Sequence, residues 1–248
     1  MEIFGVVIAF FITLAVSFFS VSTGGTSLIM VPVLISLGMP PKNAIATNMF
    51  GLIFLSIGGT VGFRKHTNDK ARLLPLSLLT VIGSAAGAAL ILIIDPHILR
   101  RILAVIVCLI AVFVIFNNKL GIDSRKKPLP ARRAVIGSSV IFILGIYGGF
   151  FSGGYVTVLS YALILLFGTT FLEAAFVSKV LNVFSSTAAC LIFYKNGLID
   201  FSIAMPLAVS MTAGAFFGAK VAVVKGNAWV RNAMIVATIA MAVKLLIF

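Results

Sequence analysis

The sequence consists largely of apolar segments that are long enough to cross a lipid bilayer. Residues 3–21, 43–63 and 201–224 each hold about 20 residues with almost no charge, and about 20 helical residues cover the ~30 Å hydrocarbon core. Because backbone N–H and C=O groups in hydrocarbon need internal hydrogen bonds, such segments form α-helices. With 61% hydrophobic residues, 10% charged residues and a mean hydropathy of +1.20, the chain is predicted to be an all-α polytopic membrane protein.

Two of the apolar segments are too short to cross an upright bilayer. Residues 28–37 and 156–167 are worth roughly 15 to 18 Å as helix, and each follows a full-length segment that stops at paired glycines and small hydroxyl residues. The breaks comprise Thr23, Gly24, Gly25, Thr26 and Ser27 in the first half, and Ser152, Gly153, Gly154 and Tyr155 in the second. A helix broken there exposes free backbone N–H groups at the positive end of its second piece, so the two breaks together predict an anion cradle near the membrane midplane. Glycines that serve only close helix packing are the alternative interpretation.

The second half of the chain repeats the first. Sliding the halves by 131 residues superposes six pairs: Arg64 and Lys195, Asp69 and Asp200, Pro75 and Pro206, Gly83 and Gly214, Gly87 and Gly218, and Arg100 and Arg231. We interpret this as an internal duplication. It divides the chain into a first repeat over residues 1–116, a basic cytoplasmic linker over 117–133 and a second repeat over 134–248.

The expected segments are residues 3–21, 28–37, 43–63, 73–94, 102–116, 134–151, 156–167, 173–194, 201–224 and 229–248. Five crossings per repeat place 13 strong cations inside and 5 outside, whereas re-entrant short pieces with four crossings give 12 against 6. The excess of Lys and Arg in cytoplasmic loops therefore favours an inverted 5+5 arrangement with the amino terminus outside. Re-entrant short segments remain the alternative.

Composition also excludes several classes of function. The net charge of +13 comes mainly from Lys and Arg in short loops, which indicates topology signals and contacts with membrane lipids, not nucleic acid. All six carboxylates lie in loops or at segment ends, which argues against a metal-cation carrier. There is no HExxH motif and there are only two cysteines, so neither an enzyme nor a cofactor or metal site is expected.

Lys179 is a strong cation that we count as lying within the membrane. It lies about two turns into residues 173–194, where an uncompensated ammonium costs at least a few kcal/mol. It either extends to the headgroup layer or faces the site and binds an anion. Asn48 occupies the matching position in the first repeat, and Asn182 lies one turn beyond Lys179; both amides are hydrogen-bond donors suited to an anion.

These motifs resemble the TauE/SafE family of membrane permeases, the sulfite and organosulfonate exporter group. The resemblance covers nearly the whole chain and rests on the order and spacing of its matching stretches: residues 22–32, 44–48 and 62–64 in the first repeat, and Ser178, Lys179, Asn182, Gly197 and Asp200 in the second. It implies transport of sulfite, thiosulfate, sulfoacetate, taurine or a related anion across a bacterial inner membrane. It specifies neither the anion nor the direction.

The residues and the resemblance agree on an anion. We expect one substrate site near the midplane, with access alternating as one repeat rocks against the other. Its expected members are Thr23, Gly24, Gly25, Thr26, Ser27, Asn48, Ser152, Gly153, Gly154, Tyr155, Lys179 and Asn182. An anion channel and a membrane scaffold without transport are the alternatives, the coupling ion is left open, and the small-residue stripes are compatible with a homodimer.

Overall fold

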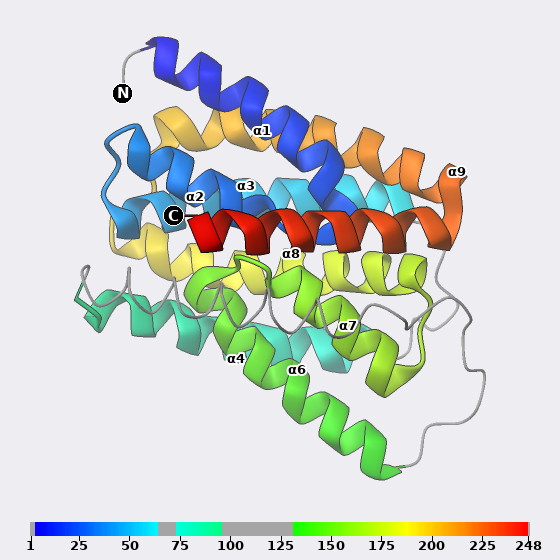
Figure 1. Ribbon diagram of the computed structural model, residues 1–248. Coiled ribbons are helices and arrows are strands. Elements are labelled where there is room, and N and C mark those ends of the chain that lie inside the picture. Colours follow the sequence, from blue (N-terminus) through cyan, green and yellow to red (C-terminus); the bar gives the residue numbers. More distant parts are fainter. Residues whose placement is uncertain (1–2, 64–72, 96–130, 248) are drawn as a thin grey trace.

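The computed structural model describes residues 3–63, 73–95 and 131–247, and all regular secondary structure in these ranges is helical (Figure 1). The expected segment 102–116 and most of the basic linker lie outside the described residues. The helices of the first half are α1 (Ile3–Thr23), α2 (Thr26–Ser36), α3 (Pro41–Phe63) and α4 (Leu73–Ile93). Those of the second half are α6 (Ala131–Phe151), α7 (Tyr155–Phe167), α8 (Phe171–Lys195) and α9 (Phe201–Ile247).

Six of the described helices are long and apolar enough to cross a membrane, whereas α2 and α7, with 11 and 13 residues, are shorter. Six of the predicted full-length segments, over residues 3–21, 43–63, 73–94, 134–151, 173–194 and 201–224, and both short segments are therefore confirmed. α9 contains the last two expected segments, which Gly226, with φ 80° and ψ −176°, separates by a sharp turn. In Figure 1 the part of α9 after this turn runs back in the opposite direction.

Helix starts differ from the prediction by two or three residues, for local reasons. α3 begins at Pro41 instead of residue 43, because proline is well suited to the first helical position, where no N–H is needed. α8 begins at Phe171, where Thr170 accepts a hydrogen bond from the Glu173 N–H and Glu173 accepts one from the Thr170 N–H. This capping box is visible in the sequence as Thr-x-x-Glu, and the prediction missed it. α6 begins at Ala131, inside the expected linker.

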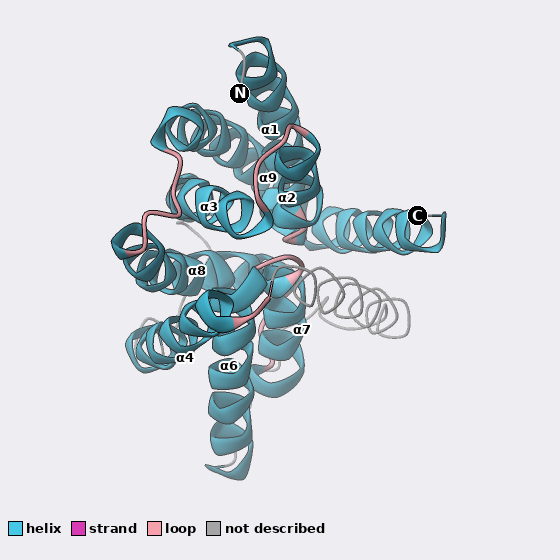
Figure 2. Ribbon diagram, turned by 90° about the vertical axis from the view of Figure 1, so that its left-hand side faces the viewer, coloured by secondary structure: helices cyan, strands magenta, loops and turns pink. Residues whose placement is uncertain are grey.

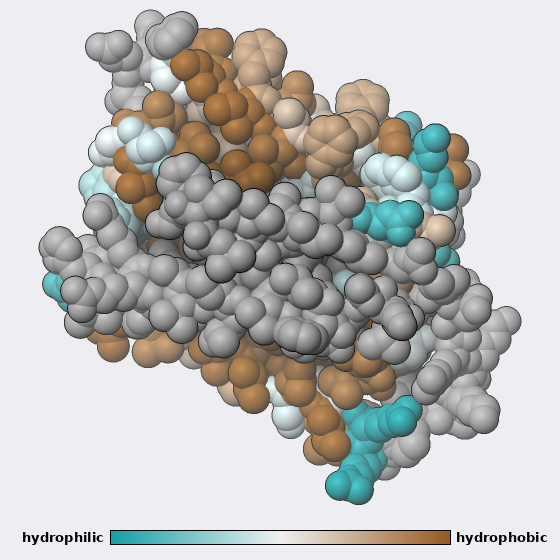
Figure 3. Space-filling view, viewed as in Figure 1, coloured by the Kyte–Doolittle hydropathy of each residue, from teal (hydrophilic) through white to brown (hydrophobic). Residues whose placement is uncertain are grey.

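The outer surface of the helices suits a lipid environment. Large apolar side chains such as Ile82, Val209 and Phe217 are each about 60% exposed. In Figure 3 the described surface along the helices is largely apolar, and the hydrophilic residues gather toward the helix ends. A soluble protein rarely exposes so much contiguous apolar surface.

At the centre, the matching helices α3 and α8 lie side by side and run in opposite directions. Gly59, near the end of α3, faces the Lys179 stem near the start of α8. Asn43, near the start of α3, donates a hydrogen bond to the Leu198 carbonyl, just beyond the end of α8 (3.2 Å). We call the two ends of the bundle the Pro41 end, where α3 begins, and the Phe63 end, where α3 ends.

The other long helices pack on this pair in two groups. Figure 2, which looks roughly along the helices, shows α1 and α9 on the α3 side and α4 and α6 on the α8 side. On the α3 side, α9 of the second half thus packs with α1 and α3 of the first half. On the α8 side, α4 of the first half packs with α6 and α8 of the second half. Lys42 donates a hydrogen bond to the Leu92 carbonyl (2.9 Å), which places the end of α4 at the Pro41 end.

Glycines allow these helices to approach closely. A Cβ atom at Gly214 of α9 would lie 2.5 Å from the Leu14 carbonyl oxygen of α1, and one at Gly218 would overlap the Phe18 carbonyl. The order of the two contacts shows that α1 and α9 run in the same direction, so α1 starts at the Pro41 end.

The same contacts recur in the other group. A Cβ atom at Gly83 of α4 would lie 2.6 Å from the Phe142 carbonyl oxygen of α6, and one at Gly87 would overlap the Ile146 carbonyl. Both glycine pairs therefore serve close helix packing. α6 runs parallel to α4 and starts at the Phe63 end.

Each short helix returns toward the end from which the preceding helix started. α2 leads within four residues into the start of α3 at the Pro41 end, and α7 leads within three residues into the start of α8 at the Phe63 end. α1 with α2, and α6 with α7, are therefore helical hairpins whose tips are the two glycine breaks.

We predict that Gly87→Val lowers the free energy of unfolding by about 1–3 kcal/mol, because the new side chain would be forced against the α6 backbone. Ala89→Val on the exposed side of the same helix is the control and should change it by less than about 0.5 kcal/mol. Thermal unfolding of the purified protein in detergent measures both. Equal loss of stability in the two variants would contradict the packing role of Gly87.

Candidate functional site

The two glycine breaks meet inside the protein. Ser27, in the first turn of α2, shares a 2.8 Å hydrogen bond with Ser152 in the second break. Thr157, in the first turn of α7, donates a hydrogen bond to the Thr23 carbonyl in the first break. All four residues are at least 95% buried. The structure thus brings together the two stretches that the sequence predicted to form one site.

Backbone geometry at the breaks requires glycine. Gly24 has φ +84°, and a Cβ atom there would lie 2.6 Å from the Thr157 nitrogen. Gly154 has φ +73°, a left-handed conformation that glycine adopts without strain. In the first break, therefore, both interpretations of the glycines apply: Gly24 breaks the helix, and it also packs closely against the start of α7.

The starts of α2 and α7 lack the side-chain caps that most helices have. Their N-cap residues are Gly25 and Gly154, and neither helix start has a side-chain cap hydrogen bond. α8, in contrast, is capped by Thr170 and Glu173. Free N–H groups and the positive end of the helix dipole make uncapped helix starts suitable for binding an anion.

Asn48 joins the first break from α3. Its Nδ2 donates a 2.8 Å hydrogen bond to Ser27 Oγ, which in turn contacts Ser152. Asn48 is 1% exposed, yet its Oδ1 has no hydrogen-bond partner among the described residues, and the same holds for the buried Ser22 Oγ. Since buried polar atoms are nearly always bonded in native structures, these two atoms are available to a ligand or to water.

Lys179 is buried inside the protein. It is 1% exposed, and its stem fills the space beside Gly59, where a Cβ atom would lie 3.2 Å from Lys179 Cγ and 2.9 Å from Val21 Cγ2. The side chain does not extend to the surface of the described protein. Lys179 therefore lies against α1 and α3. The neighbouring part of α1, at Val21, is within one turn of the first break.

No carboxylate neutralises Lys179 within the described part of its surroundings. The carboxylates that the structure describes, Asp95, Glu173 and Asp200, lie at helix ends, and Glu173 is engaged in the cap of α8. A buried ammonium without a counter-charge is costly. An anionic ligand would supply the missing charge.

Asn182 binds the central helix pair together. Its Nδ2 donates a 2.8 Å hydrogen bond to Ser56 on α3, and its Oδ1 accepts one from Ser186 (3.2 Å). With both amide atoms engaged, Asn182 supports the seam between α3 and α8. Its role as a direct ligand, expected from the sequence, has no contact in favour of it here.

The contacts divide the predicted residues into two adjoining groups. The break residues and Asn48 form one group, and Lys179 with Asn182 forms the other, along the α3–α8 seam. Gly59, which lies against both Lys179 and Val21, connects them, because Val21 stands two residues before Thr23. Sequence reasoning missed several hydroxyl partners of these residues because Ser and Thr are common in membrane helices: Ser20, Ser56, Thr157, Ser160 and Ser186.

The described residues contain no group of three or more His, Cys, Asp or Glu side chains that could bind a metal ion. Polar contacts near the breaks come from hydroxyl, amide and backbone groups. Such groups bind oxyanions well.

We predict that Gly24→Ala costs about 2–5 kcal/mol of unfolding free energy, from a left-handed backbone and overpacking against α7. Gly38→Ala is a matched control, because Gly38 has φ +92° but nothing lies within 4 Å of a Cβ placed there. It should cost only the backbone term, about 1–2 kcal/mol. Thermal unfolding in detergent compares the two, and equal costs would argue against a tight contact between the breaks.

Comparison with known proteins identifies the family. A family model described as "Sulfite exporter TauE/SafE" matches residues 9–245. The chain is 30% identical over 239 residues to a "Probable membrane transporter protein" of Haemophilus influenzae, covering 96% of this chain and 93% of that protein. It is 28% identical over 242 residues to the "Probable membrane transporter protein YfcA" of Escherichia coli K12, covering 96% and 88%.

A third relative, the "Probable membrane transporter protein ORF9" of Sinorhizobium sp., is 26% identical over 226 residues, covering 90% of this chain and 85% of that protein. No solved structure matches the chain. These names describe membrane transporters and not enzymes. The match over nearly the whole length shows that this chain is a membrane transporter of the TauE/SafE family.

Proposed function

We propose that the protein carries a small sulfur-containing anion, such as sulfite, thiosulfate or an organosulfonate, across the bacterial inner membrane. This proposal is carried by the meeting of the starts of α2 and α7, neither with a side-chain cap, inside the bundle near the buried Lys179, for which the described residues offer no acidic partner. A sulfur oxyanion presents several acceptor oxygens around one centre, which suits converging N–H and O–H donors.

Charge balance favours an anion over a cation. Near the breaks the described charge is that of Lys179, while the described carboxylates lie at helix ends. A cation at this depth would need a carboxylate partner. An anion instead offsets the desolvation cost of the ammonium, and neither charge is then left unpaired in hydrocarbon.

The helix directions support an inverted repeat. The matching helices α3 and α8 run antiparallel, and both are long and apolar enough to span. Two equivalent spanning helices that run in opposite directions belong to repeats of opposite topology. The glycine contacts agree with this arrangement: α9 of the second half packs on α1 of the first half, and α4 of the first half packs on α6 of the second half.

The positions of the Lys and Arg residues indicate which end of the bundle faces the cytoplasm. Arg132, Arg133, Lys220 and Lys225 belong to the Phe63 end, where α6 starts and the first part of α9 ends. The basic loop 64–72 leaves α3 at the same end. We therefore assign the Phe63 end to the cytoplasm and the amino terminus to the opposite side.

The packing between the two halves of the chain determines which helices would move together when access alternates. Since α9 packs with α1 and α3, and α4 packs with α6 and α8, each moving body contains a helix from the other half. We propose that α1–α3 with the first part of α9 rocks against α6–α8 with α4. The α3–α8 seam, held by Ser56 and Asn182, and the two glycine breaks, held by Ser27 and Ser152, are contacts between the two bodies.

Binding of the anion is tested by thermal stability in detergent with sulfite, thiosulfate, sulfoacetate and taurine, against phosphate, acetate and metal cations. At about a hundred times its dissociation constant, a ligand should stabilise the folded protein by about 2.7 kcal/mol. Lys179→Met should abolish this stabilisation, because it removes the charge that the anion neutralises. Lys195→Met, at the exposed end of the same helix, should keep it.

Selective stabilisation by one sulfur anion would name the substrate class. Transport of that anion in proteoliposomes, with saturation and trans-stimulation, would distinguish a carrier from a channel. If no anion stabilises the protein, or if Lys179→Met folds and transports normally, the proposed site is wrong.

A further inference from the structure

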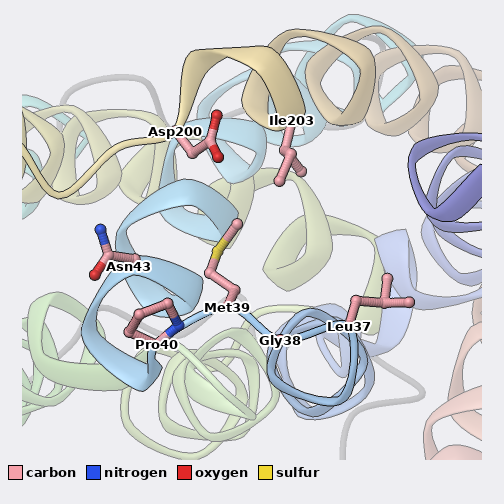
Figure 4. A pocket seen from close by; sticks show the side chains of 7 residues that line it. All are labelled: Leu37, Gly38, Met39, Pro40, Asn43, Asp200 and Ile203. Carbon is pink, nitrogen blue, oxygen red and sulfur yellow. The ribbon is translucent and has the colours of Figure 1, made fainter. Parts of the chain in front are cut away.

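A cavity of about 190 Å³ opens at the Pro41 end of the bundle (Figure 4). It lies between the turn after α2, the start of α3 and the start of α9. The lining residues are Leu37, Gly38, Met39, Pro40, Asn43, Asp200 and Ile203. In Figure 4 the side chains of Met39, Asp200 and Ile203 extend into the space between these elements.

Polar side chains of α3 lie between this cavity and the glycine breaks. Asn43, on the cavity wall, and Thr47, one turn deeper and fully buried, lie on one face of α3. Asn48 follows directly and donates to Ser27, which contacts Ser152. Since buried hydroxyl and amide groups are costly in an apolar bundle, such a series suggests a route for a polar ligand.

The turn between α8 and α9 forms one wall of this route. The Asp200 N–H donates a hydrogen bond to Thr47 Oγ1 (3.1 Å), and Asn43 donates to the Leu198 carbonyl (3.2 Å). Breaking these two contacts would widen the passage along α3. Asp200 accepts hydrogen bonds from the Ser202 N–H and hydroxyl (3.0 and 2.6 Å), so its carboxylate is held in place at the start of α9.

The corresponding position at the Phe63 end is covered. The Leu172 N–H, in the first turn of α8, donates to Asn227 Oδ1 (2.9 Å), just after the sharp turn in α9. Thr170 and Glu173 complete the cap of the same helix. Among the described residues, a cavity opens at the Pro41 end, and Asn227 of α9 lies over the start of α8 at the Phe63 end.

We propose that the cavity at the Pro41 end is the extracytoplasmic entrance of the transport route, along which the anion passes Asn43 and Thr47 to reach Ser27 and Ser152. This inference rests on the proposed transport function and adds the route and its outer mouth. Asp200 places one negative charge at this mouth. It disfavours anions there and so limits how often they enter.

Cysteine labelling tests the route. In a chain whose two cysteines are replaced by alanine, Asn43→Cys and Ile203→Cys line the cavity, whereas Met205→Cys, 54% exposed on the outside of α9, faces lipid. A charged, membrane-impermeant methanethiosulfonate reagent added outside intact cells should modify the two cavity cysteines and block most uptake of a labelled sulfur anion. The Met205→Cys variant should keep its transport.

The outcomes separate the route from the function. If the variants transport the anion but modification at Asn43→Cys and Ile203→Cys leaves transport unchanged, the entrance is wrong and the proposed function stands. The same conclusion follows if these cysteines react only from the cytoplasmic side of inverted vesicles. Absence of transport and of ligand stabilisation in the unmodified protein overturns both.

Charge at the mouth is tested by Asp200→Asn, which keeps a good helix cap and removes the charge. For an anion supplied outside, KM should fall about threefold. This is the effect of removing a unit negative charge about 6 Å from the anion in water. The difference in KM should shrink at high salt. Glu173→Gln, which also keeps its cap but lies at the other end, is the control with unchanged KM. An unchanged KM in Asp200→Asn, or an equal fall in both variants, contradicts the proposed mouth.

Discussion

Backbone polar groups that leave a helix inside a membrane must find partners within the protein, and the architecture depends on this constraint. The chain breaks at Gly24 and again at Ser152–Gly154, in the middle of an apolar bundle. Each break is tolerated because it packs against the other: Thr157 bonds the Thr23 carbonyl, and Ser27 bonds Ser152. The two hairpins therefore support each other, and the same contact creates a polar centre that a simple bundle of spanning helices would lack.

Close helix packing holds this centre in place. Without a hydrophobic force between helices in lipid, association depends on van der Waals contact and interhelical hydrogen bonds. Gly83, Gly87, Gly214 and Gly218 bring α4 and α9 against the backbones of α6 and α1. These contacts cross between the halves of the chain, so neither half forms its own compact bundle. The result is two mixed bundles whose seam runs between α3 and α8.

Much of this could be predicted from the sequence because its causes are local. Segment lengths follow from hydropathy, and the paired glycines with adjacent hydroxyls indicated both breaks correctly. The start of α8 was also predictable from Thr170 and Glu173, but that signal was missed. Asn182 shows what the sequence could not supply: its amide is bonded to Ser56 on another helix and to Ser186 on its own next turn, and its role as a ligand stays a prediction.

By itself, the sequence determined that this chain is a helical membrane protein with two similar halves, each with a break that exposes free N–H groups, because length, hydropathy and glycine placement act within a few residues of each other. Only the tertiary structure decided that the breaks meet, that α9 packs with α1 while α4 packs with α6, and that Lys179 lies buried beside Gly59. Contacts between helices far apart in the chain depend on side-chain shape at the crossing points. No periodicity along one segment encodes which distant segment will fit it.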